Sequence, residues 1–173
     1  MKKYPYIFMA FLWATAATPT FAGNLWQNTT SGMNPDDVKK LYPDATTPRE
    51  IDGQKTMLLK NIMIFDEKFD AIFYFRSERL TKVTLNITNA LNPSAFQARI
   101  PQATFALIRD ELMKKYGQPV NTRSSLMGNN IDFIKNDTSI ELTYYDTSNL
   151  SSNNVTRSIS ITYEAPDGGN TPL

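Results

Sequence analysis

Runs of strand-like sequence constrain the fold of this chain more than any other feature. Thr56–Phe65, Phe69–Phe75 and Arg79–Ile87 are rich in β-branched and aromatic residues, and short polar breaks separate them. Breaks of this length join antiparallel strands. Because successive side chains of a strand point to opposite faces, the apolar residues of the second and third runs fall on one face. They are Phe69, Ala71, Phe73, Phe75, Val83, Leu85 and Ile87. We expect this face to line the core.

The C-terminal third of the chain returns to strand-like sequence. Strands are predicted over Ile131–Lys135, Thr138–Tyr145 and Val155–Tyr163, with Thr122–Met127 as a further candidate. Asn136-Asp137 favours a tight hairpin turn, because both residue types tolerate left-handed backbone. The polar segment Thr147–Asn154 is the best candidate for a loop that contacts a partner.

Two helices are predicted. Asn34 is a suitable N-cap, Pro35 suits the first helical position, and Pro43 ends the helix after about two turns. The second helix begins near Pro101 and has one apolar stripe, made by Phe105, Ile108, Leu112 and Tyr116. Gly117 is placed for a left-handed C-terminal cap.

This order of elements predicts an α+β fold, with helices packed on one face of an antiparallel sheet. Each helix precedes a run of strands, and Val38–Pro43 echoes Leu112–Gly117, which suggests a duplicated α-β-β-β unit with repeats at 32–90 and 98–165. We expect a single domain over 23–165 and a flexible tail over 166–173.

The N-terminus indicates export. Lys2 and Lys3 precede the apolar stretch 7–17, and Ala22 offers a small residue for cleavage, so residues 1–22 are predicted to be a signal peptide. The apolar stretch is much shorter than the roughly 20 residues that span a bilayer, so we expect no stable membrane insertion after cleavage. The mature chain is expected in the periplasm or outside the cell.

The composition excludes several function classes. The chain has no cysteine and no histidine, so a thiol nucleophile, a Ser-His-Asp triad, a zinc finger and a haem ligand cannot be formed. Its 18 basic residues nearly balance its 17 acidic residues, which gives no electrostatic reason to bind nucleic acid. We expect no cofactor and no metal site, since Asp132, Asn136 and Asp137 lack the spacing of a calcium loop.

Carboxylates are the only strong general acids and bases left for an enzyme. Asp66, Glu67 and Asp70 lie together around one predicted hairpin. Turns select aspartate without catalysis, so we favour a structural role for them. A carboxylate-dependent hydrolase is kept as a minor alternative, and the expectation is that the chain is not an enzyme.

Part of the chain resembles a known family. The residues that carry the likeness are Gly32-Met33, Asp36–Val38, Leu41–Pro43, Phe73–Phe75 with Leu80 and Val83, and Leu112–Pro119. In this order they resemble small periplasmic proteins related to the β-lactamase inhibitor protein and to outer-membrane assembly lipoproteins of the BamE (SmpA/OmlA) type. The resemblance implies a helix-on-sheet scaffold that binds other proteins. The chain lacks the lipid-bearing cysteine of an assembly lipoprotein, which leaves a free inhibitor or accessory binder as the closer analogy.

The functional prediction is a soluble exported protein-binding module, of the inhibitor or immunity type, that uses the exposed face of its sheet. If Ile140, Leu142 and Tyr144 point inward, their neighbours on the strand point outward. The predicted binding residues are Tyr74, Lys82, Thr84, Glu141, Thr143 and Tyr145. Tyrosine offers a large contact area at a small entropic cost, which suits this role. The alternative is a periplasmic envelope or stress accessory protein, and in either case the partner is another protein.

Overall fold

The computed structural model of the chain describes residues 23–51, 53–87, 102–147 and 157–165. The predicted signal peptide, the connector after residue 87, all but the first residue of the predicted loop Thr147–Asn154, and the tail from residue 166 lie outside the described residues.

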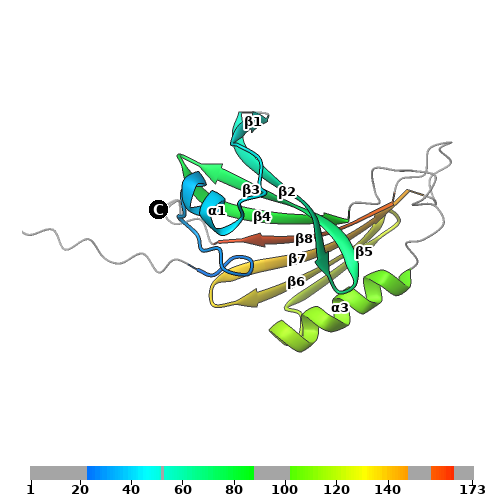
Figure 1. The fold of residues 1–173 in the computed structure, drawn as a ribbon. Coiled ribbons are helices and arrows are strands. Elements are labelled where there is room, and N and C mark those ends of the chain that lie inside the picture. Colours follow the sequence, from blue (N-terminus) through cyan, green and yellow to red (C-terminus); the bar gives the residue numbers. More distant parts are fainter. Residues whose placement is uncertain (1–22, 52, 88–101, 148–156, 166–173) are drawn as a thin grey trace, which may run out of the picture.

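The described chain is built on one eight-stranded antiparallel sheet (Figure 1). Its strands are β1 (Arg49–Ile51), β2 (Gln54–Ile64), β3 (Glu67–Arg76), β4 (Arg79–Ile87), β5 (Asn121–Ser125), β6 (Gly128–Lys135), β7 (Thr138–Asp146) and β8 (Arg157–Glu164). The order across the sheet is β1-β2-β3-β4-β8-β7-β6-β5. Two meanders are therefore joined where β4 pairs with β8, with Leu85 opposite Ile161.

Tight two-residue turns connect three of the hairpins. Both central residues have positive φ at Phe65-Asp66, Ser77-Glu78 and Asn136-Asp137. This is the pattern of type I′ turns, whose twist matches that of the flanking strands. The tight turn predicted at Asn136-Asp137 is confirmed.

The first helix, α1 (Pro35–Leu41), begins as predicted. The Oδ1 atom of the N-cap Asn34 accepts a hydrogen bond of 2.9 Å from the backbone N–H of Asp37. Such a short helix is held by packing rather than by its own hydrogen bonds. Val38 is fully buried, and Tyr42, which follows the helix, stacks on Phe73 of β3 with ring centroids 5.4 Å apart.

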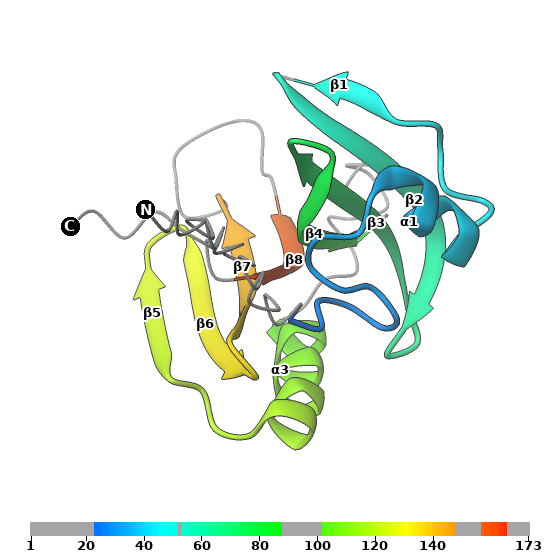
Figure 2. The same ribbon diagram turned by 90° about the vertical axis from the view of Figure 1, so that its left-hand side faces the viewer.

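The second helix is α3 (Gln102–Tyr116), and its predicted stripe is buried at Phe105, Ile108 and Leu112. Phe105 packs on Tyr144 of β7, with ring centroids 5.5 Å apart. Gly117 has a φ of +92° and its N–H bonds to the carbonyl of Met113, which is the predicted C-terminal cap. Figure 2 shows the curved sheet with α3 beside β6.

The predicted fold class is wrong. The structure is a sheet-dominated fold rather than a sheet with helices packed across one face. Most buried apolar residues of the described chain belong to strands, and α1 and α3 supply only Pro35, Val38, Phe105, Ile108 and Leu112. Helices of seven and fifteen residues are too short to form a layer over eight strands. The predicted α-β-β-β unit is not observed either, because four strands follow each helix.

No helix within the described ranges is long and apolar enough to cross a membrane.

Candidate protein-binding face

The sheet has one apolar face and one polar face. The predicted inward residues Ile140, Leu142 and Tyr144 are buried, so the predicted register of β7 is confirmed. The opposite side of the same strands, which we call the polar face, carries mostly polar residues, with Ile72 and Ile134 as apolar exceptions. In its central part the polar residues are Tyr74, Lys82, Thr84, Arg123, Asn130, Asp132, Glu141, Thr143, Tyr145, Ser160 and Thr162. All six predicted binding residues lie on this face.

One cluster on the polar face is formed by β3 and β4. Tyr74 lies directly opposite Lys82, and the Lys82 Nζ atom lies 4.6 Å from the centre of the Tyr74 ring. This contact holds the ammonium group over the ring face by a cation–π interaction. Burial raises the pKa of Tyr74, while a hydrogen bond with Thr84 acts in the opposite direction. The cluster presents an ordered aromatic ring with a cation beside it.

A second cluster crosses β5, β6 and β7. The Arg123 guanidinium lies 3.1 Å from Oδ1 of Asp132 and 3.1 Å from Oε1 of Glu141. Asn130 donates a hydrogen bond of 2.8 Å to the same Glu141 oxygen. Asp132 and Glu141 are opposite one another in the pairing of β6 and β7, so Arg123 offsets the repulsion of two facing carboxylates. This part of the face is polar and internally bonded.

Tyr145 lies next to exposed apolar side chains at the turn between β5 and β6. Its hydroxyl is 4.0 Å from the Sδ atom of Met127, in the turn between β5 and β6. Tyr145 is 37% exposed, Met127 is 43% exposed and the adjacent Leu126 is 78% exposed. Exposed apolar side chains rimmed by polar residues are typical of protein interaction sites. We call Leu126, Met127 and Tyr145 the apolar tip.

Small polar residues of β8 join the two clusters. Thr162 pairs with Thr84 on one side and with Glu141 on the other, and Ser160 pairs with Thr143. With neighbouring strands about 4.8 Å apart, Tyr74 and Tyr145 are separated by roughly 25 Å along and across the sheet. A standard interface of about 800 Å² per partner is roughly 30 Å across, so one partner could cover both tyrosines.

Sequence reasoning missed the residues that link the predicted ones. The serine and threonine residues of β8 carry no functional signal of their own, since small polar residues fill any exposed sheet face. Arg123 belongs to a strand that was predicted only as a candidate. Its opposition to Asp132 and Glu141 depends on the pairing of β5, β6 and β7, which no local pattern reveals.

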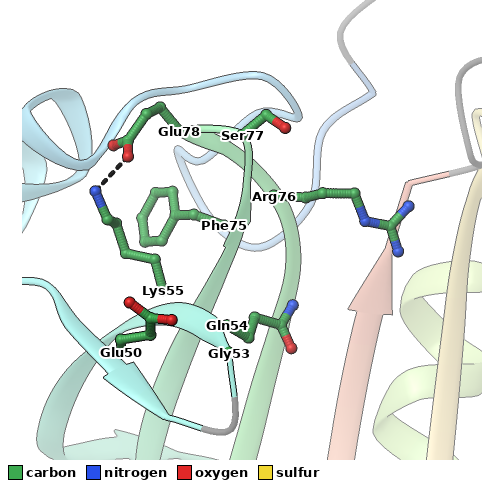
Figure 3. A pocket seen from close by; sticks show the side chains of 8 residues that line it. All are labelled: Glu50, Gly53, Gln54, Lys55, Phe75, Arg76, Ser77 and Glu78. Atoms are coloured by element: carbon green, nitrogen blue, oxygen red, sulfur yellow. Dashed lines mark hydrogen bonds and ion pairs between the residues drawn. The ribbon is translucent and has the colours of Figure 1, made fainter.

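A shallow hollow at the far edge of the sheet is a second candidate site (Figure 3). Its volume is about 390 Å³, and it lies between the β1–β2 hairpin and the β3–β4 turn. Lys55 and Glu78 form an ion pair beside it, while Arg76 points away from that pair. The residues that line it are Glu50, Gly53, Gln54, Lys55, Phe75, Arg76, Ser77 and Glu78. Because its charges are already paired in part and its base is open, we rank it below the polar face.

Two of the three carboxylates of the hydrolase alternative, Asp66 and Asp70, have structural roles. Asp66 occupies a type I′ turn with a φ of +62°. Asp70 is 9% exposed, and its Oδ1 accepts a hydrogen bond of 2.9 Å from the backbone N–H of Asn61, at the irregularity in β2. In the described part of the chain, no group of three or more Asp or Glu residues is arranged to hold a metal ion.

A buried tyrosine on the opposite face gives a pH-dependent prediction. The Tyr144 hydroxyl donates a hydrogen bond of 2.9 Å to Asp146, and Arg157 bonds to the same carboxylate oxygen at 3.1 Å. Burial raises the pKa of Tyr144 from 10.0 to about 12, helped by the hydrogen bond and the charge of Asp146 and opposed by the charge of Arg157. The folded state thus holds its proton more tightly than the unfolded state.

Stability should therefore fall as the pH rises from 10 toward 12, and the loss should be smaller in Tyr144→Phe. Denaturant unfolding at pH 8, 10 and 11 measures this difference. Burial also raises the pKa of Tyr163, so the variant is expected to reduce the slope rather than abolish it. The same slope in both proteins would contradict the assignment to Tyr144.

Comparison with known proteins identifies a family. A family model described as "Uncharacterised protein" matches residues 26–171. No curated protein and no solved structure matches the chain. The resemblance to the β-lactamase inhibitor protein and to BamE-type lipoproteins therefore stays a prediction.

Proposed function

This chain belongs to the uncharacterised protein family that its residues 26–171 match, and from that premise we propose that it is an exported, non-catalytic module that binds another protein through its polar face. The observation that carries the proposal is the pair of ordered tyrosine sites on one sheet face, Tyr74 under Lys82 and Tyr145 beside Met127. Small serine and threonine residues between them permit close approach of a partner.

The chemistry of this face suits recognition better than catalysis. The carboxylate of Glu141 is held in place by Arg123 and Asn130. Rigid aromatic anchors with a polar surround are the residues that carry most binding energy at protein interfaces. The proposed export rests on the N-terminal basic, apolar and small-residue pattern.

The test is a pull-down from envelope extract with purified exported protein as bait. Tyr74→Ala and Tyr145→Ala should each weaken capture of the same partner by about tenfold or more, because loss of an interface anchor costs about 2 kcal/mol or more. Leu107→Ala is the matched control, since Leu107 is 48% exposed on α3, away from the polar face.

Two outcomes would count against the proposal. Equal recovery with both tyrosine variants would remove the polar face as the binding surface. Weak capture of many proteins would instead favour the envelope or stress accessory role.

A further inference from the structure

The last strand of the sheet, β5, has an edge with no neighbouring strand in the described part of the chain. All five of its residues are exposed, and all five pair in regular register with β6. Proteins protect such edges with proline, charged side chains, bulges or very short strands. The opposite edge is short, because β1 has only three residues. Within Asn121–Ser125 there is no proline and no register shift, and the one charged side chain, Arg123, forms ion pairs with Asp132 and Glu141 of its own chain.

Exposed apolar side chains flank both ends of this edge. Val120, immediately before β5, is 60% exposed, and Leu126, immediately after it, is 78% exposed. They are equally distant from Arg123, the central residue of the strand. Two copies of β5 can pair antiparallel about a two-fold axis at Arg123. Each residue before Arg123 in one copy then lies opposite the residue that is equally far after Arg123 in the other copy. Thr122 then meets Ser124, Asn121 meets Ser125, and Val120 meets Leu126.

This self-complementarity is what a two-fold contact requires, because each surface must match itself. Both exposed apolar residues would be covered at once, and twice per dimer. The arrangement also places the two Arg123 side chains opposite each other, and facing like charges destabilise a strand pair. Here each guanidinium is already bonded to Asp132 and Glu141 of its own chain, which offsets that charge.

We propose that two copies of this chain associate through β5 and extend the two sheets into one. An edge contact of five residues per chain buries less than a standard interface, so the dimer is weak. It should form between about 10 µM and 1 mM protein. The two polar faces then become one continuous surface, which would let a dimer present two copies of the proposed binding face.

The test is sedimentation velocity across that concentration range, with protein purified after expression of the full-length chain. Val120→Lys combined with Leu126→Lys places like charges opposite each other and should raise the dissociation constant by at least about tenfold. Val120→Lys combined with Leu126→Glu places opposite charges across the same axis and should restore the dimer. Met63→Lys is the control, because Met63 is 60% exposed on β2 at the other half of the sheet, and it should leave the dissociation constant unchanged.

A monomer at every concentration up to 1 mM would overturn the proposal, as would a dimer that both double variants leave intact. Weakening by both double variants alike would overturn the antiparallel register about Arg123. Each of these results is independent of the pull-down, because the tyrosines tested there are not part of the β5 edge.

Discussion

Replacing Gly128 with alanine is expected to lower the free energy of unfolding by about 3 kcal/mol or more, from backbone strain and steric overlap together. Gly128 has a φ of +144°, a conformation that residues with a side chain rarely adopt. A Cβ atom there would lie 1.8 Å from the carbonyl oxygen of Tyr144 and 2.8 Å from its carbonyl carbon. Both are backbone atoms of β7, so relief requires β6 and β7 to separate where Gly128 pairs with Tyr145.

Urea unfolding of Gly128→Ala and Gly117→Ala measures this effect. Gly117 also has positive φ, at +92°, but a Cβ atom added there would meet nothing within 4 Å. Its replacement should cost only the left-handed backbone penalty of about 1–2 kcal/mol. Equal losses in the two variants would mean that the close approach of β6 to β7 is not the constraint at Gly128.

Replacing Phe73 with alanine is expected to cost about 3–5 kcal/mol, the range for deleting a large aromatic side chain from a core. Phe73 is fully buried on β3. Its ring lies 5.4 Å from that of Tyr42 and 6.2 Å from that of Trp26, between centroids. It therefore joins the segment around Trp26 and the end of α1 to the sheet, and its loss should loosen both before the sheet unfolds.

Trp26 reports on this loosening directly, because it is the only tryptophan in residues 23–173. It is 4% exposed, so Phe73→Ala should shift its emission to longer wavelength and make it easier to quench with iodide. Phe73→Leu, which keeps most of the volume, is the control and should change the emission little. If emission is unchanged in Phe73→Ala, the packing around Trp26 does not depend on Phe73.

Much of the local structure could be predicted from the sequence because local rules decide it. Alternation assigned the faces of β3, β4 and β7, since a shift of one residue would expose Phe73 or Leu142 to water. Asn34 and Gly117 marked helix ends because backbone groups there need specific partners. These features depend on neighbours within a few residues.

The rest depends on distant parts of the chain. No sequence pattern within β4 predicts that it pairs with β8, yet this pairing makes one sheet from two meanders. The strand β5 is exposed throughout and lacks the apolar alternation that identified the other strands. The turn at Ser77-Glu78 lacks the glycine or asparagine that usually signals a type I′ turn. The predicted fold class was wrong because it treated two short helices as a complete layer on the sheet.

For the candidate site, too, the sequence predicted the faces of single strands but not the arrangement across the sheet. Tyr74, Thr84 and Tyr145 were placed on the correct face by alternation alone. The distance between Tyr74 and Tyr145, and the position of Thr162 between Thr84 and Glu141, depend on the β4–β8 and β7–β8 pairings. The bonding of Glu141 to Arg123 joins strands β5 and β7 across β6, so it could be found only in three dimensions.

The most direct test of recognition through the polar face is hydroxyl-radical footprinting of the chain with and without its captured partner. Oxidation of Tyr74, Met127 and Tyr145 should slow when the partner binds, while oxidation of Leu107 on α3, which lies outside the polar face and the apolar tip, should not change. Protection confined to the region of Leu107, with Tyr74 and Tyr145 as reactive as before, would contradict binding through the polar face.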